Sequence, residues 1–292
     1  MTELNAWRER QYWSDVVAAR PDALIEQWIE ESRAVRCAAA GVRDHPYGRH
    51  PRQRLDVFRP NGSGPWPLLV FVHGGYWQLG DRRDWAFLAR GWNRAGVAVA
   101  TLGYRVAPEV TLEEIADDVR AALAELATLS SAESLAADRI VVAGVSAGAH
   151  LSALAVAGPT GGLEPHAALL ISGVYDPHPL GGTTPGVAIE ASLELPVERI
   201  SPYGRPAPQC PALICWGGAE TDVFRAQSQS LCAHWQAWGA NVTAASIDGV
   251  NHYTIVECLQ EDHDGPIRAF LQEQFFGTPG EGPGSAPGAA SA

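Results

Sequence analysis

Five short, almost purely apolar runs recur along this chain and constrain its fold more than any other feature. Stretches with the 3.6-residue periodicity of amphipathic helices lie between them. Strands that are apolar throughout are buried on both faces, which is typical of parallel sheets covered by helices. The sequence therefore predicts an α/β fold with a mostly parallel central sheet and helices on both faces. The apolar runs are residues 68–72, 97–102, 140–145, 167–172 and 212–216, and the helical stretches are 85–95, 112–129 and 147–156.

Other segments extend this sheet at both edges. Residues 53–58 alternate between apolar and polar types, as expected of an edge strand. Beyond Asp222 the alternation of helix and strand continues, so the chain is expected to add one more strand and two more helices. These elements are expected as a helix to about residue 238, a strand at 242–247 and a helix at 266–275.

The domain organisation follows from the same pattern. We expect residues 1–276 to form one domain, to which residues 1–50 contribute a helical N-terminal arm or cap. The Pro- and Gly-rich segment 175–186 is too irregular for the sheet and is a candidate cap or lid element. The Gly-, Pro- and Ala-rich tail at 277–292 has no periodicity and is expected to be disordered.

Composition and charge exclude several classes of function. The 292 residues are 46% hydrophobic and only 18% charged, so they can bury a sizeable core. A net charge of −12 argues against binding nucleic acid or an anionic membrane surface, since both need positive charge. Five cysteines without C-x-x-C spacing indicate neither a disulfide framework nor a structural zinc site. Residues 1–12 are charged with no apolar segment behind them, so no secretory signal is predicted and a cytoplasmic location is expected.

The pattern G-x-S-x-G occupies residues 144–148, where the strand expected at 140–145 meets the next helix. Small residues flank Ser146 because the chain must turn sharply there, which lifts its Oγ out of the carboxyl edge of the sheet. The N–H of Ala147 then faces the negatively charged oxygen that develops on a substrate. Ser146 is therefore the candidate nucleophile. The pattern alone would also fit a glycine-rich helix start with a buried serine.

A second motif, HGGYW at residues 73–77, follows directly after the strand expected at 68–72. Glycines lack a Cβ and allow backbone N–H groups to turn inward, so Gly74 and Gly75 are candidates for the other oxyanion donors. A tight turn would use the same glycines. It would not predict their position upstream of a G-x-S-x-G serine, so the two motifs together indicate an oxyanion hole.

A nucleophilic serine also needs a base, which follows it along the chain in sheets of this type. His252 lies in a loop after the last expected strand, which is the position of such a base. His234 falls within a helix among tryptophans and is expected to pack. His150 follows Ser146 by four residues on one helix, where a core or supporting role is favoured, and His73 is expected to shape its loop.

The acid that orients this base is expected in the loop after residues 212–216. Glu220 and Asp222 both lie there. Either carboxylate would hold His252 in the correct tautomer and stabilise the imidazolium that forms during catalysis. Spacing alone does not separate the two.

Taken together, these residues resemble the kynurenine formamidases (arylformamidases), enzymes of the α/β-hydrolase fold close to the hormone-sensitive-lipase-like esterases. The resemblance implies Ser146 as nucleophile, His252 as base and Gly74, Gly75 and Ala147 as oxyanion donors. A gap-free register on the motif F-x-x-Q-S places the family's acidic residue at Glu220, with Asp222 as the alternative. Val145 and Val223 depart from the family pattern, in which a histidine and an acidic residue are common. The resemblance spans about residues 54–275 and rests on HGGYWQ at 73–78, SAGAHL at 146–151, SGVYD at 172–176 and F-x-x-Q-S at 224–228.

The family resemblance also implies a reaction. It predicts cleavage of an aryl formamide, N-formyl-L-kynurenine, to L-kynurenine and formate through an acyl-enzyme, with no metal and no organic cofactor. Tyr76 and Trp77 are expected to stack on the aromatic ring, with core packing as the alternative for Trp77. A carboxylesterase acting on short acyl or aryl esters is the alternative function. The expected partner is such a small aromatic molecule, not nucleic acid or a membrane, and a homodimer is left open.

Overall fold

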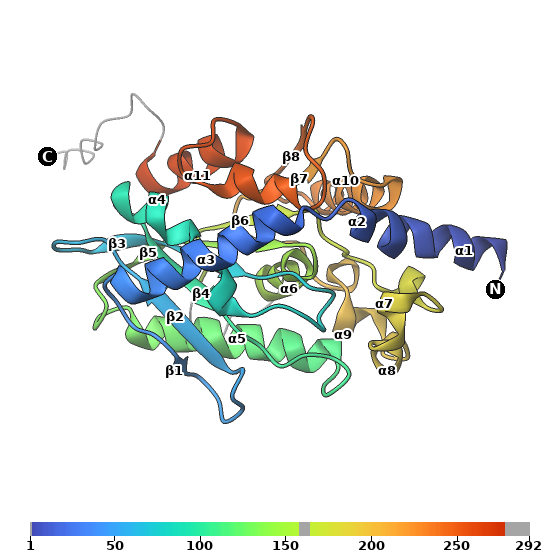
Figure 1. The fold of residues 1–292 in the computed structure, drawn as a ribbon, viewed down its shortest axis with the longest axis horizontal. Helices are drawn as coiled ribbons and strands as arrows, with labels where there is room; N and C mark the ends of the chain where they lie inside the picture. Colours follow the sequence, from blue (N-terminus) through green and yellow to red (C-terminus); the bar gives the residue numbers. More distant parts are fainter. Residues whose placement is uncertain (1, 158–163, 278–292) are drawn as a thin grey trace, which may run out of the picture.

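The computed structural model describes residues 2–157 and 164–277 and contains an eight-stranded sheet (Figure 1). The strand order is β1-β2-β4-β3-β5-β6-β7-β8. Strand β2 runs antiparallel to both neighbours, and every other adjacent pair is parallel. The predicted mostly parallel sheet is therefore confirmed. The strands are β1 (His45–Pro46), β2 (Arg54–Phe58), β3 (Trp66–Val72), β4 (Ala98–Leu102), β5 (Leu135–Val145), β6 (Ala167–Ile171), β7 (Ala212–Gly217) and β8 (Val242–Ile247).

Two of these strands differ from the sequence-based expectation. The strand expected at the edge, β2, has the two-residue strand β1 outside it. Strand β5 begins at Leu135 rather than at Ile140, because Leu135 pairs with Trp66 before a shift in register. The polar residues Asp138 and Arg139 interrupt the apolar pattern between these two points, so the early part of the strand was not recognisable from periodicity.

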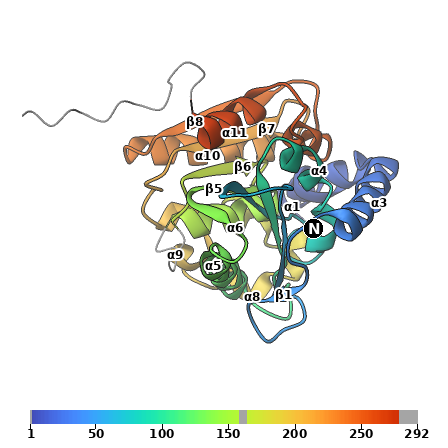
Figure 2. The ribbon, with the colours of Figure 1, turned by 90° about the vertical axis from the view of Figure 1, so that its left-hand side faces the viewer.

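Helices cover both faces of the sheet because alternate strand residues point to opposite sides. In β3, Leu68, Val70 and Val72 belong to one apolar cluster, whereas Leu69 and Phe71 belong to another. Helices α5, α6 and α10 pack on the first face, and α3, α4 and α11 on the second. Figure 2 shows α5 and α6 on one side of the strands and α3 and α4 on the other. These helices are α3 (Asp22–Ala38), α4 (Leu88–Arg94), α5 (Leu112–Leu129), α6 (Ala147–Val156), α10 (Asp222–Ala237) and α11 (Pro266–Phe276).

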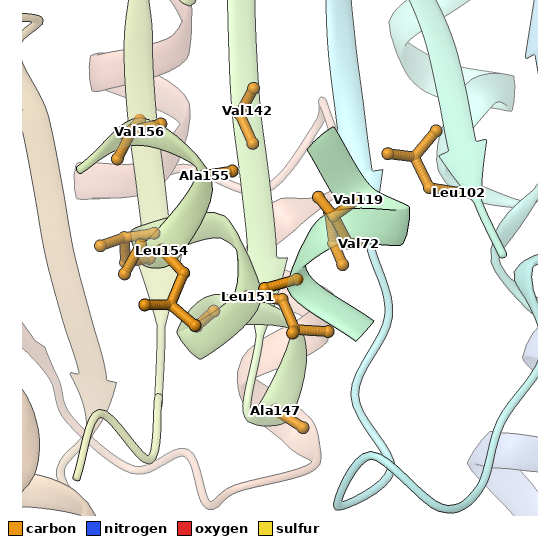
Figure 3. Packing of buried hydrophobic residues seen from close by; sticks show 14 of the residues in the cluster. Val72, Leu102, Val119, Val142, Ala147, Leu151, Leu154, Ala155 and Val156 are labelled. Carbon is orange, nitrogen blue, oxygen red and sulfur yellow. The ribbon is translucent and has the colours of Figure 1, made fainter. Parts of the chain in front are cut away.

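Helix α6 is buried along its whole length, and its position fixes the turn that precedes it. Leu151 and Leu154 belong to the same apolar cluster as Val142 of β5 and Val119 of α5, and Figure 3 shows them around α6. A helix start held this firmly is a rigid support for a functional side chain.

The N-terminal arm is helical, as expected, and lies against the body of the fold (Figure 1). It begins with α1 (Glu3–Glu9), passes through a π-helical turn at Arg10–Ser14 and α2 (Asp15–Ala18), and turns at Pro21 into α3. The ring of Tyr12 packs against Phe224 of α10, with 6.1 Å between centroids. The arm therefore reaches helix α10, which lies between β7 and β8 in the chain.

The candidate lid segment, residues 175–186, and the residues that follow it form a series of short helices. They are His178–Leu180, α7 (Thr184–Val187), α8 (Glu190–Leu193), α9 (Val197–Ile200) and Pro202–Gly204, of which the first and last are 3-10 helices. Thr184 bonds the carboxylate of Glu9 through both its N–H and its hydroxyl. The segment thus supports α1. The tail expected at 277–292 lies, except for Gly277, outside the described residues. Among the helices of the described part, none is both long and apolar enough to cross a membrane.

Candidate active site

Ser146 stands on a sharp turn between β5 and α6. Its backbone has φ 57° and ψ −122°, a strained conformation for a residue other than glycine, and its N–H donates to the Ile171 carbonyl at 2.8 Å. Helix α6 and strand β3 approach so closely here that a Cβ on Gly148 would lie 2.0 Å from the Val72 carbonyl oxygen. The glycines of the motif therefore allow the turn, and the turn presents the Ser146 side chain at the carboxyl edge of the sheet.

His252 and Glu220 meet Ser146 in a continuous chain of hydrogen bonds. The Nε2 atom of His252 lies 3.0 Å from Ser146 Oγ, and its Nδ1 atom lies 3.0 Å from Glu220 Oε2. The other carboxylate oxygen of Glu220 accepts from the Gly217 N–H at 2.7 Å and from the Ser172 hydroxyl. Because an ionised carboxylate only accepts, Nδ1 carries the proton and Nε2 faces Ser146 with its lone pair.

This geometry separates the two carboxylates that the sequence left open. Glu220 is buried, with 6% of its surface exposed, and bonds His252 directly. Asp222 is the first residue of α10, its side chain is 73% exposed, and it pairs with Arg225. Among the described residues, no hydrogen bond or ion pair joins the exposed Asp222 to His252, so the structure places Glu220, not Asp222, beside the histidine.

The three residues predicted to supply backbone donors lie on the loop after β3 and at the start of α6. A Cβ on Gly74 would lie 2.9 Å from the Val145 carbonyl oxygen and 3.1 Å from Ser146 Cβ, so the loop passes directly beside the serine. Within the described residues, the N–H groups of Gly74 and Gly75 donate no hydrogen bond. Ala147 is the first residue of α6, where an N–H has no partner within its own helix. Of the three predicted donors, Gly74 and Ala147 thus flank Ser146, and Gly75 lines the same cavity.

Two buried aromatic residues support this loop. His73 precedes the glycines, and its Nδ1 lies 2.7 Å from the Gly74 carbonyl oxygen. Tyr104 stacks on the His73 ring at 4.3 Å and donates its hydroxyl to the His73 carbonyl at 2.7 Å. Burial lowers the pKa of His73 to about 4, so its ring is neutral at pH 7. His73 shapes the loop, as expected from the sequence.

The adjacent residues Tyr76 and Trp77 have different environments. Tyr76 lines the cavity beside Ser146 and donates its hydroxyl to the Tyr12 carbonyl. Trp77 is fully buried in the core, does not line that cavity, and donates Nε1–H to His150 Nδ1 at 3.2 Å. The ring stacking expected for Trp77 is therefore corrected to core packing. His150 also bonds the Ile200 carbonyl at 2.7 Å, and burial lowers its pKa to about 4.

A cavity of about 440 Å³ opens beside Ser146 and His252. One wall of this cavity comes from the N-terminal arm, and that contribution was not predicted from the sequence. Amphipathic helices with periodic tryptophans were recognisable there, but not the surface that they cover. Trp13 of this wall contacts Tyr76 edge-to-face at 5.5 Å. The arm contributes Trp13, Val17, Arg20, Ile25, Trp28 and Ile29 to the wall, and the body adds Leu79, Gly80, Asp84, Trp85, Tyr253 and Val256 to the residues already described.

The remaining histidines and acidic residues do not assemble into a second centre. Within residues 2–157 and 164–277, no three His, Cys, Asp or Glu side chains gather in a way that would hold a metal ion. His234 lies on α10 between the rings of Tyr203 and Trp238, as expected of a packing residue. Within the described residues, the groups that could take part in catalysis are therefore those around Ser146.

Comparison with known proteins agrees with this geometry. A family model described as the alpha/beta hydrolase fold matches residues 69–256. The kynurenine formamidase of Danio rerio is 27% identical over 267 residues, covering 88% of each chain. Esterase LipC of Mycobacterium tuberculosis is 36% identical over 152 residues, or 46% of this chain and 36% of LipC. The crystal structure of a candidate thioesterase from Silicibacter sp. TM1040 has a TM-score of 0.74 at 26% identity, covering 93% of this chain and all of that one.

Proposed function

Because the chain belongs to the alpha/beta hydrolase fold family, we propose that it is a serine hydrolase that cleaves N-formyl-L-kynurenine to L-kynurenine and formate. The observation that carries the proposal is the hydrogen-bonded chain from Ser146 through His252 to Glu220. Nucleophile, base and orienting acid in this order are the requirements of acyl transfer. The similarity to kynurenine formamidase over 88% of both chains supports a formamide as the acyl donor.

The proposed reaction begins when Ser146 Oγ attacks the formyl carbon and His252 Nε2 accepts its proton. The N–H groups of Gly74, Gly75 and Ala147 stabilise the oxyanion of the tetrahedral intermediate. His252 then donates the proton to the departing aniline nitrogen, which releases L-kynurenine and leaves a formyl ester on Ser146. Water, deprotonated by His252, attacks this ester, and His252 returns the proton to Ser146 Oγ as formate leaves.

An aryl formamide matches both the chemistry and the shape of the site. Its aniline leaving group is less basic than an alkylamine, and its formyl group is the smallest acyl group, which suits a serine flanked by backbone. The cavity has the volume of a small-molecule site and carries several aromatic side chains. Offset or edge-to-face contacts with these rings would hold the aryl group. The aromatic side chains are Trp13, Trp28, Tyr76, Trp85 and Tyr253.

A carboxylesterase acting on short acyl or aryl esters is the second candidate. The similarity to esterase LipC, which extends over 46% of this chain, favours this function. The same serine, base and oxyanion donors serve ester and formamide cleavage alike. The two functions therefore differ in acyl and leaving group, not in mechanism.

Turnover of the purified protein distinguishes these functions. We expect kcat/KM for N-formyl-L-kynurenine, followed through the absorbance of kynurenine, to exceed kcat/KM for p-nitrophenyl acetate and p-nitrophenyl butyrate. The Ser146→Ala variant serves as the blank for both assays. A clear preference for p-nitrophenyl butyrate would reject the formamidase and favour the esterase.

A further inference from the structure

The cavity beside Ser146 is mostly apolar, and this makes its few charges informative. Of the described residues that line it, Arg20 and Asp84 are the only arginine, lysine, aspartate or glutamate. The charges are opposite in sign and come from different parts of the fold. Arg20 lies in the turn between α2 and α3, whereas Asp84 lies in the 3-10 helix Arg82–Trp85. A charge in an apolar wall is costly unless a partner meets it.

Asp84 has no such partner among the described residues. Across residues 2–157 and 164–277, no hydrogen bond or ion pair uses its carboxylate oxygens; only its backbone carbonyl is bonded, by the Ser32 hydroxyl at 2.7 Å. Burial raises the pKa of this half-buried carboxyl group, and the neighbouring Asp81 adds to the effect. The arginines around it are committed elsewhere, in the pairs Arg33 with Glu30, Arg36 with Asp56, and Arg83 with Asp81.

Arg20 is only partly engaged. Its Nε lies 3.2 Å from the exposed Asp22, and its side chain is 50% exposed. Within the described chain, its two terminal nitrogens make no hydrogen bond. The preceding residue, Ala19, accepts a bond from the Asn251 side chain next to His252, so the turn that carries Arg20 is tied to the loop of the proposed base. Two guanidinium donors therefore remain available for an anion.

We propose that Arg20 and Asp84 bind the carboxylate and the ammonium group, respectively, of a substrate with a zwitterionic α-amino acid head. The acylated aryl amine at the other end of the substrate then reaches Ser146. This inference rests on the proposed function for the identity of the scissile group. A single cation and a single unpaired anion in one aromatic cavity match a molecule that carries one charge of each sign beside a ring. Neither residue touches the reacting atoms, so both determine specificity through binding.

The first experiment compares substrates that differ in one charge at a time. The series consists of N-formyl-L-kynurenine, its analogue without the amine, its carboxamide, and formanilide, which lacks both groups. Asp84→Asn should lower kcat/KM about tenfold or more for substrates that carry the amine, mainly through KM, and leave the analogue without the amine unchanged. Arg20→Gln should act in the same way on substrates that carry the carboxylate. Asp138→Asn and Arg139→Gln, which lie outside the cavity, are the matched controls.

Equal losses on all four compounds, or no loss on any, would overturn the proposal. The same comparison with aryl acetates in place of the formamides tests the head-group site separately from the formamidase function. If only the acetates are cleaved, the formamidase function fails while the two charge preferences are still measured.

Calorimetric binding of L-kynurenine to Ser146→Ala, alone and combined with Asp84→Asn or Arg20→Gln, needs no turnover. We expect about tenfold weaker binding in each double variant, and unchanged binding or no binding to Ser146→Ala itself would reject the head-group site. Thermal melts of each variant show that it is folded.

Discussion

The hydroxyl of Tyr76 donates a hydrogen bond to the main-chain carbonyl of Tyr12, which joins the proposed oxyanion loop to the N-terminal arm. Tyr76 follows the two glycines of that loop, and Tyr12 lies in the π-helical turn of the arm. The Tyr12 hydroxyl in turn accepts from the Gln227 side chain at 3.1 Å. Wide helical turns of this kind are frequent at functional sites. The arm is therefore part of the wall of the site and also holds the loop that carries Gly74 and Gly75.

Replacing Tyr76 by phenylalanine removes this bond and keeps the ring in the cavity. The Tyr12 carbonyl loses its side-chain donor in a buried place, so we expect the free energy of unfolding to fall by about 1–3 kcal/mol. We also expect kcat/KM to fall severalfold because the oxyanion loop is held less firmly. Denaturant unfolding and steady-state kinetics measure the two effects. Tyr203→Phe, outside the cavity, is the control, and equal behaviour of the two variants would contradict the proposed coupling.

Removal of the Ser146 hydroxyl tests the nucleophile. The three groups of a serine triad act as a unit, so Ser146→Ala should lower kcat by about 10⁴-fold or more. Its small side chain fits the same turn, and the melting temperature should stay close to that of the wild type. Ser63→Ala, in an exposed turn, should change neither quantity. Turnover retained by Ser146→Ala would show that another group attacks the substrate.

The contact between Glu220 and His252 gives a second test of the proposed triad. Glu220→Gln keeps the shape of the side chain but removes the charge that stabilises the imidazolium, so kcat should fall by about 10²- to 10⁴-fold. Asp222→Asn removes only an exposed pair with Arg225 and should leave kcat within about twofold. The ratio of the two effects on kcat is the measurement. A larger loss for Asp222→Asn would reverse the assignment.

The sheet was predictable because its strands are buried on both faces and read as uninterrupted apolar runs. Strand β8 was found at its observed bounds, Val242–Ile247, and α5 at Leu112–Leu129. The two-residue strand β1 was not found, since a segment this short has no period. The beginning of β5 was missed where polar residues interrupt its apolar run.

The candidate site likewise contains residues that local sequence patterns predict and residues that they do not. Ser146, His252 and the glycine loop were recognisable because local motifs place each at the end of a strand. The choice between Glu220 and Asp222 depends on where two side chains point after a turn, which spacing does not determine. The role of Trp77 depends on its backbone, whose φ of 60° accompanies full burial of the ring. The contribution of the arm is a contact between distant parts of the chain and has no local pattern.

Trp13 and Trp77 therefore should respond differently to substitution. Trp13→Ala removes a ring from the cavity wall, so KM for an aryl formamide should rise about three- to tenfold, the loss expected for one aromatic contact. Trp77→Phe disturbs buried packing and the bond to His150, so it should lower stability by about 1–3 kcal/mol with little change in KM. Kinetics and unfolding of both variants test this contrast. A higher KM for Trp77→Phe than for Trp13→Ala would show that the cavity wall is assigned wrongly.

Two buried histidines predict a specific dependence of stability on pH. Burial lowers the pKa of both His73 and His150 to about 4, below the ordinary value of 6.5. Unfolded chains then bind more protons than folded ones between these values, so stability is fully present above pH 6.5 and falls as the pH drops toward 4. From pH 7 to pH 5.5 each histidine should cost about 1 kcal/mol of the free energy of unfolding.

The variant His150→Gln isolates one of these contributions. Glutamine can accept from Trp77 and donate to the Ile200 carbonyl, as His150 does, but it does not titrate. Denaturant unfolding at pH 7 and pH 5.5 should therefore show a decrease smaller by about 1 kcal/mol in the variant than in the wild type. Carboxylates add little to the comparison because they titrate mainly below this window. Equal decreases in the two proteins would mean that His150 is protonated as readily in the folded chain as in the unfolded one, and that its ring is not held neutral between Trp77 and Ile200.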